Sequence, residues 1–204
     1  MNDRIERREV RDSAQVRLLS SPVRQELVDT LAALGGEADV AALAEQLGRP
    51  ADGLYYHVRA LVAGGLLREA PAREGGERRY RFAGEGVGPL RLAYDLGAGG
   101  NSGELRAFAR GLLQIAGRDF ENALANEEAA VAGTERELWA SRNKGWLSAE
   151  DLAEVNALLE RLSELTSQAK TDDRGHLSSF AFVLAPINAL PKRRVQKEGG
   201  LVRD

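Results

Sequence analysis

Residues 40–82 decide the fold of this chain, and their sequence is VAALAEQLGRPADGLYYHVRALVAGGLLREAPAREGGERRYRF. The pattern predicts a short helix over residues 40–47, a tight turn at Gly48, and a second helix from about Pro50 to Ala63. Asp39 is expected to cap the first helix, because a short acceptor side chain satisfies free backbone N–H groups. The inward-facing apolar positions are Leu43, Ala44, Leu47, Leu54, Val58, Leu61 and Val62.

Two short strands follow the second helix. They span residues 66–71 and 79–82, on either side of a glycine-centred turn at residues 73–77. Because side chains alternate along a strand, the two aromatic residues of the second strand share one face and its two arginines share the other. The sequence therefore predicts a helix-turn-helix with an adjoining hairpin, one face of which is free for an anion.

The second helix carries the polar and aromatic side chains that a DNA-reading helix needs. In a helix-turn-helix, the second helix presents its N-terminal half to the major groove. Tyrosine offers a hydroxyl to phosphate and a ring to thymine methyl groups, and arginine binds phosphate or guanine. His57 either donates to phosphate or hydrogen-bonds inside the domain to fix the helix. The predicted DNA-binding residues, including three from the hairpin, are Arg49, Asp52, Tyr55, Tyr56, His57, Arg59, Arg73, Arg78 and Arg79.

Arginine dominates this region, with lysine absent from residues 1–84. Between Arg49 and Arg81 there are seven arginines against four acidic residues, a local excess that suits bidentate phosphate or guanine contacts. The hairpin arginines, Arg81 included, are placed to straddle the minor groove or its phosphates. Two alternatives remain open: a solvated hairpin tip, and a codon bias that favours arginine throughout the chain.

The chain resembles ArsR-like winged helix-turn-helix regulators over about residues 15–83. The matching stretches are LSSPVR (19–24), VAALA (40–44) and LYYHVRALVAGGLL (54–67). The resemblance implies a dimeric bacterial transcription factor, usually a repressor that a ligand releases from DNA. Founding members of that family sense metals through cysteine pairs, and this chain contains no cysteine. The chain also continues for more than 100 residues beyond the hairpin, well past a single closing dimer helix.

Composition excludes several other classes of protein. The net charge is −3, with 43% hydrophobic and 29% charged residues, which is typical of globular proteins. Without cysteine, and with only two histidines, the chain is not expected to hold a transition metal or another cofactor. It has neither a membrane-length apolar run nor a visible signal segment, so a cytoplasmic protein is expected. It also lacks a nucleophile elbow, a phosphate loop or any evident catalytic set, so we do not expect an enzyme.

The whole chain is expected to be mainly helical, of the α+β class. The sequence SSP at 20–22 starts a helix that ends at Gly35-Gly36 and precedes the quoted stretch. The expected divisions are a flexible N-terminal arm (1–13), a winged helix-turn-helix DNA-binding domain (14–84), a glycine-rich linker (85–102), a C-terminal dimerisation or effector domain (103–190), and a flexible basic tail (191–204).

The C-terminal domain is expected to be mostly helical with a short strand. A long helix is predicted from Asn101 or Ser102 to about Val131, and its heptad-like apolar seam favours dimerisation. A second helix begins at Ser148 with an acidic first turn, which suits the helix dipole. A turn at 171–175 leads into a predicted strand over 177–184.

Between these two helices lies a cluster of aromatic and cationic residues. It consists of Trp139, Arg142, Lys144 and Trp146, and such a combination suits an anionic or aromatic ligand. The alternative is that both tryptophans pack in a second core.

The sequence thus favours a sequence-specific, DNA-binding transcriptional regulator: a dimeric bacterial repressor relieved by a non-metal small ligand. The expected partners are double-stranded DNA, a second copy of the chain and a small-molecule effector. Two alternatives remain, a winged-helix module that binds another protein and a DNA-binding regulator that has no ligand sensor.

Overall fold

The computed structural model describes residues 9–72, 76–84 and 90–187, and its N-terminal half is an α+β winged helix. This half contains the helices α1 (Ser13–Leu18), α2 (Pro22–Ala33), α3 (Val40–Leu47) and α4 (Ala51–Ala63) and the strands β2 (Glu37–Asp39), β3 (Leu67–Ala70) and β4 (Arg79–Phe82). The other described elements are β1 (Glu9–Val10), β5 (Arg91–Leu92), α5 (Ser102–Leu124) and α6 (Ala149–Thr166).

The sheet of the winged half has three antiparallel strands in the order β2-β4-β3. The central strand β4 places Tyr80 opposite Ala38 on one side and opposite Glu69 on the other. Tyr80 and Phe82 are buried, while the two arginines of β4 are only partly covered, so the predicted alternation of β4 is confirmed. The strand β2 was not predicted, because three residues between a Gly-Gly turn and a helix leave no periodic signal.

Local sequence signals set the ends of the helices as predicted. The Asp39 carboxylate accepts a 2.8 Å hydrogen bond from the Ala42 backbone N–H, which caps α3. Gly48 ends α3 with a φ of 60°, a left-handed conformation that favours glycine. At α6, Ser148 and Asp151 form a reciprocal capping box.

One hydrophobic core joins the helices of the winged half to its sheet. Burying a leucine or valine side chain contributes about 1.5–3 kcal/mol, so this cluster is the main source of stability in the described residues. Its fully buried members include Val16, Leu27, Leu31, Val40, Leu43, Val58, Leu61, Leu66 and Leu67.

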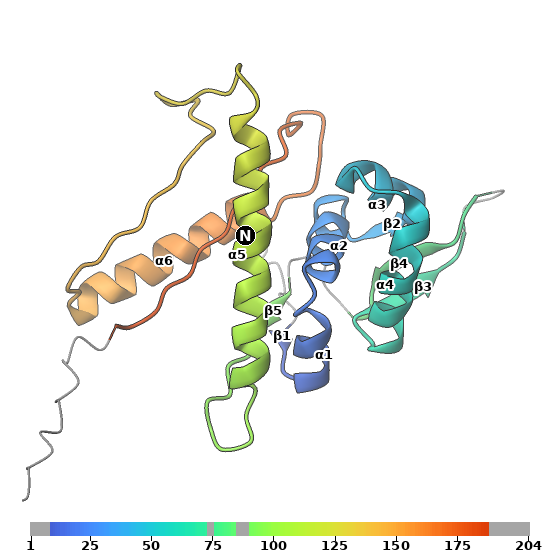
Figure 1. Cartoon of the computed structure of the whole chain (residues 1–204), viewed down its shortest axis with the longest axis horizontal. Coiled ribbons are helices and arrows are strands. Elements are labelled where there is room, and N and C mark those ends of the chain that lie inside the picture. The colour runs from blue at the N-terminus through green and yellow to red at the C-terminus, as the bar shows by residue number, and fades with distance from the viewer. Residues whose placement is uncertain (1–8, 73–75, 85–89, 188–204) are drawn as a thin grey trace, which may run out of the picture.

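The long helix α5 packs against α1 and α2 and stands between the winged half and most of α6 (Figure 1). The closest approach is at Gly111, where an added Cβ would lie 2.7 Å from Nε2 of Gln25. The buried Gln25 amide donates to the backbone oxygens of Leu19 at 2.7 Å and Phe108 at 3.1 Å. Glycine at this position therefore allows α5 to contact α2 through a buried polar side chain.

The C-terminal half departs from the prediction in two places. The helix α5 ends at Leu124 and not near Val131, because the chain turns at 125–128. A further turn follows at Gly133, whose φ of 78° favours glycine. The stretch 177–184 is extended, but the prediction of a strand there is wrong for the described protomer, since no other described segment pairs with it. A strand exists only when a neighbour completes its hydrogen-bond ladder.

Residues within the predicted N-terminal arm and glycine-rich linker form part of this architecture. The two-residue strands β1 and β5 pair in parallel, and Val10 of β1 is fully buried. In the predicted linker, the buried side chain of Asn101 accepts from the Asp95 N–H and donates to the Ala93 oxygen. The predicted basic tail and the first eight residues lie outside the described part of the chain, and the domain limits stay predictions.

Candidate nucleic-acid interface

The helices α3 and α4 form the helix-turn-helix, joined by Gly48, Arg49 and Pro50. The apolar face of α4 is buried against the core, which leaves its polar and aromatic face outside. On that outer face Asp52 and Arg59 are exposed, and Tyr56 is 72% exposed. Tyr55, also predicted to contact DNA, is half-buried and packs against the core. The free surface of α4 therefore centres on Tyr56.

Arg49 lies at the start of α4, but it is already engaged inside the protein. Its guanidinium forms a 2.9 Å ion pair with one carboxylate oxygen of Glu26 in α2. The other oxygen of Glu26 is 2.5 Å from the guanidinium of Arg118 in α5, which also contacts Asp119 at 2.8 Å. Glu26 is only 8% exposed, so this bridge is shielded from water. Hydrogen bonds to Glu26 and then Asp119 raise the pKa of Arg118 above its ordinary value.

Because Glu26 binds both arginines, one carboxylate of α2 connects α5 to the turn between α3 and α4. No sequence pattern pointed to this connection, since its members are 23 and 92 residues apart.

His57 is partly buried, and its ring makes an edge contact with Tyr56 at 5.4 Å between centroids. Its Nδ1 atom is buried and has no hydrogen-bond partner among the described residues. Burial, followed by the charges of Arg24 and Arg49, lowers the pKa of His57 below its ordinary value. The site therefore favours the neutral imidazole, and the second predicted role of His57, a hydrogen bond within the domain, is not seen for Nδ1.

The hairpin arginines have different surroundings. Arg78 is exposed and forms a 2.8 Å ion pair with Glu69 across the hairpin. Arg79 is 19% exposed; its Nη1 contacts the Glu37 carboxylate at 2.7 Å and its Nη2 donates to the Glu37 backbone oxygen at 3.1 Å. Arg79 thus ties β4 to β2, which leaves little of it for DNA. The predicted contact residue Arg73 lies outside the described residues.

A second arginine on the sheet was missed by the sequence reasoning. Arg68 of β3 lies directly opposite Arg81 of β4, and the Nε atom of Arg81 is buried without a partner in the described part of the chain. Like charges facing each other across strands are destabilising unless an anion lies between them. The pairing register, which the sequence did not specify, is the signal that would have identified Arg68.

The four residues of the predicted ligand cluster do not enclose a cavity in the described protomer. Trp139, Arg142, Lys144 and Trp146 all lie exposed on an extended segment between α5 and α6, with Trp146 94% exposed. The one ring contact in this segment is between Arg136 and Trp139, at 4.0 Å from the ring centroid. Neither the predicted ligand site nor the alternative, a second core, is assembled here by one copy of the chain.

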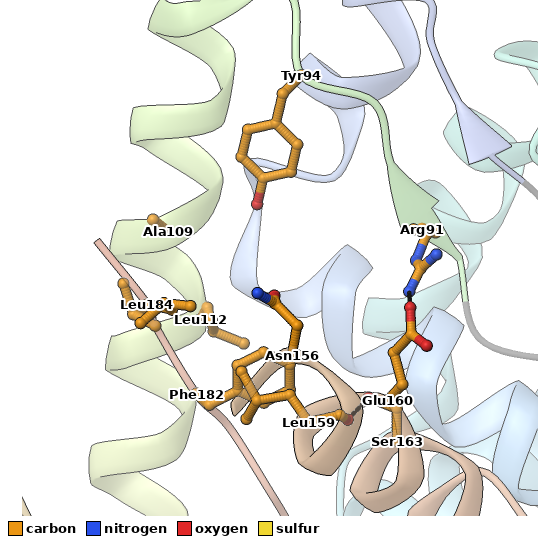
Figure 2. Close-up of a pocket in the computed structure, with 11 residues that line it drawn as sticks. Arg91, Tyr94, Ala109, Leu112, Asn156, Leu159, Glu160, Ser163, Phe182 and Leu184 are labelled. Atoms are coloured by element: carbon orange, nitrogen blue, oxygen red, sulfur yellow. Dashed lines mark hydrogen bonds and ion pairs between the residues drawn. The ribbon is translucent and has the colours of Figure 1, made fainter. Parts of the chain in front are cut away.

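A cavity of about 260 Å³ lies elsewhere in the C-terminal half, where β5, α5, α6 and the extended C-terminal segment meet. Figure 2 shows Tyr94 and Asn156 pointing into the space beside an Arg91–Glu160 ion pair, whose atoms are 3.4 Å apart. The apolar part of its lining consists of Ala109, Leu112, Leu159, Phe182, Val183 and Leu184. The cavity therefore combines an apolar wall with hydrogen-bonding groups, as small-molecule sites do.

Comparison with known proteins addresses the winged half. Residues 19–70 match the profile of a protein family described as a helix-turn-helix domain. The chain carries a helix-turn-helix domain. The matched residues include α2, α3, α4 and β3, which are the elements that position the outer face of α4. This domain indicates a DNA-binding regulator.

No curated protein matches the chain. Within the described ranges, every helix is too short or too polar to cross a membrane.

Proposed function

We propose that this protein is a cytoplasmic, sequence-specific transcriptional regulator of the ArsR-like type, a homodimeric bacterial repressor that a non-metal small ligand releases from DNA. The observation that carries the proposal is the outer face of α4, where Asp52, Tyr56 and Arg59 are exposed on a helix whose other face is fixed by the core. Tyr56, at the centre of α4, is 72% exposed, which suits contact with DNA.

The proposed docking follows the geometry of other helix-turn-helix proteins. The N-terminal half of α4 enters the major groove, and two copies read half-sites about 34 Å apart. Arg59 contacts phosphate or a guanine edge, and Tyr56 contacts phosphate or a thymine methyl group. The facing pair Arg68 and Arg81 on the hairpin sheet binds a flanking phosphate, which offsets their mutual repulsion.

The cavity between β5, α5 and α6 is the proposed effector site, in place of the exposed tryptophan segment. Its apolar wall and the Arg91–Glu160 pair suit an apolar molecule with a polar or anionic end. A ligand that moves α5 also moves Arg118, which changes the hold of Glu26 on Arg49. The proposed signal therefore passes from the cavity through Arg118 and Glu26 to Arg49, two residues before α4.

The test begins with selection of bound DNA from a random pool, followed by affinity measurements at several salt concentrations. Arg59→Ala and Tyr56→Ala are compared with Arg106→Ala, an exposed arginine on α5 outside the proposed interface. We expect Arg59→Ala to cost about 1–3 kcal/mol of binding if it reads a base, or to reduce the salt slope by about one if it binds phosphate. Arg106→Ala should retain both affinity and slope.

The outcomes separate the remaining alternatives. Wild-type DNA affinity in both α4 variants, with unchanged folding, would refute the proposed interface. Absence of any selected DNA would favour a winged-helix module that binds another protein. A regulator without a sensor would select DNA but show no stabilisation in a thermal-shift screen of metabolites, because a specific ligand stabilises the native state by mass action.

A further inference from the structure

Two extended segments flank α6, and neither makes a strand ladder in one copy of the chain. We call residues 138–147 the first arm and residues 177–187 the second arm. No backbone N–H within either arm donates to a backbone oxygen of the described residues. Unpaired backbone groups in extended chain are the template for pairing with another strand. The order of extended segment, helix and extended segment is that of a βαβ unit whose strands lack neighbours.

The arms also expose large apolar side chains. Nine of them are between 43% and 94% exposed, whereas a soluble monomer exposes such residues singly and not in contiguous groups. In the second arm, the rings of Phe180 and Phe182 lie 5.9 Å apart. These nine residues are Trp139, Trp146, Leu147, Leu177, Phe180, Phe182, Val183, Leu184 and Ile187.

The helix between the arms has the same character. α6 has no buried residue, and its apolar residues Leu152, Leu158 and Leu165 are each more than 40% exposed. A helix with an apolar stripe is stable in water mainly when that stripe is covered. The arms and α6 therefore all leave large apolar side chains exposed in the single chain, although Val155, Leu159 and Leu162 of α6 are partly covered.

The amount of exposed surface matches what a dimer would cover. The chain exposes 15865 Å² in total. If the 33 residues outside the described ranges were fully exposed, they would account for about 5,200 Å² of this, leaving at least about 10,700 Å² on the described part. A compact monomer of that size exposes about 8,200 Å². The excess of about 2,500 Å² per copy is about 5,000 Å² for two copies. This total is larger than the roughly 1,600 Å² of a standard interface and lies at the upper end of the roughly 2,000–5,000 Å² of obligate dimers.

We infer that a second copy of this chain covers the arms and α6, with the arms of the two copies pairing edge to edge into a sheet that lies over α6. The inference rests on the homodimer of the proposed function and names the segments that form it. A second copy fits because each copy brings both unpaired strand edges and an apolar face, which is the self-complementarity that a two-fold interface requires. The pairing is strand addition, in which backbone hydrogen bonds give affinity and alternate side chains give specificity.

The test combines light scattering after gel filtration with hydrogen exchange of the full-length protein. The disrupting variant is Leu177→Asp with Phe180→Asp, two exposed residues of the second arm that do not line the cavity described above. The matched control is Leu96→Asp, because Leu96 is 77% exposed and lies outside the arms and α6. We expect the wild type and the control to be dimers whose arm amides exchange at least about 100-fold more slowly than those of the disrupting variant. The disrupting variant should be a monomer that keeps slow exchange in α2 and α4.

A second variant tests the backbone pairing separately from the side chains. Ala140→Pro removes one N–H of the first arm at an exposed position and changes little apolar surface. It should raise the dissociation constant of the dimer at least tenfold if that arm contributes to a sheet.

Each other outcome overturns the inference in a distinguishable way. A dimer with fast exchange in both arms would leave the homodimer intact and refute arm pairing. A wild-type monomer that binds selected DNA would refute the homodimer together with the arms. A monomer with slow arm exchange would show that the two arms pair within one chain.

Discussion

The two halves of this protein carry similar amphipathic patterns but differ in what covers them. In the winged half, Leu54, Val58 and Leu61 of α4 are all buried by α2, α3 and the sheet. In the C-terminal half, α6 repeats the same spacing, yet no residue of it is buried. An apolar stripe therefore predicts that a helix will be covered, but not whether the cover comes from the same chain. The winged half covers the apolar face of its own helix α4, whereas the C-terminal half leaves much of the apolar face of α6 exposed.

The largest expected difference between the halves is the cost of removing a core leucine. Leu61→Ala should lower the free energy of unfolding by about 2–5 kcal/mol, because Leu61 is fully buried and the substitution leaves a cavity. Leu158→Ala on α6, where the side chain is 61% exposed, should change it by less than about 0.5 kcal/mol in the dilute protein. Urea unfolding at low and high protein concentration measures both effects.

The dependence of these two costs on protein concentration tests the comparison further. If a second copy covers α6, Leu158→Ala should become destabilising as the protein concentration rises, while the cost of Leu61→Ala stays nearly constant. A large cost for Leu158→Ala at all concentrations would mean that α6 is already covered within one chain, and the contrast between the halves would fail.

The next largest change in stability is expected where α5 packs against α2. Gly111→Ala should displace the Gln25 amide and lose its hydrogen bonds to Leu19 and Phe108, at about 1–3 kcal/mol. The higher helix propensity of alanine offsets about 1 kcal/mol of this loss. Gly117→Ala in the same helix meets no atom within 4 Å and should stabilise by about 0.5–1 kcal/mol. Opposite signs for the two variants are expected in urea unfolding, and equal signs would contradict the tight α2–α5 seam.

The smallest expected effect is the contribution of His57 to the pH dependence of stability. Because His57 has a pKa below the ordinary 6.5, the unfolded state binds more protons between those two values. Stability should therefore fall as the pH drops from 6.5 through the folded pKa. This contribution should be smaller than the effect of Gly111→Ala, and His57→Gln should remove it. Desolvation, followed by the charges of Glu26 and Asp119, raises the pKa of Asp29 to about 7, so Asp29 adds a dependence of opposite sign that His57→Gln leaves in place. If His57→Gln left the change in stability between pH 6.5 and lower pH as it is in the wild type, the acid-sensitive group would lie outside α4.

Much of the winged half was predictable from sequence because its signals are local. The bounds of α3, its Asp39 cap and its Gly48 end, and the bounds of β4 agree with the structure, since each depends on neighbouring residues. The two-residue strands β1 and β5 were missed, because their pairing joins residues about 80 apart. The prediction that α5 continues to Val131 failed because the heptad-like pattern does not encode where a helix loses its packing partner.

The candidate interface was predictable only in part, for the same reason. Periodicity identified the outer face of α4 and hence Tyr56 and Arg59, because the buried face fixes the exposed one. It could not show that Arg79 is held by Glu37, or that Arg68 faces Arg81, since both depend on strand register. Whether these residues contact DNA stays a prediction.

The two ion pairs of Glu26 have a consequence for engineering the two halves separately. One carboxylate binds two arginines, so Glu26→Gln would remove both ion pairs and leave at most one of Arg49 and Arg118 hydrogen-bonded to residue 26. The variant would keep the helix-turn-helix and the C-terminal half but lose the ion pairs that join them through Glu26. Under the proposed function, an exchanged C-terminal half would transmit its own stimulus only where its helix supplies a cation at the position of Arg118.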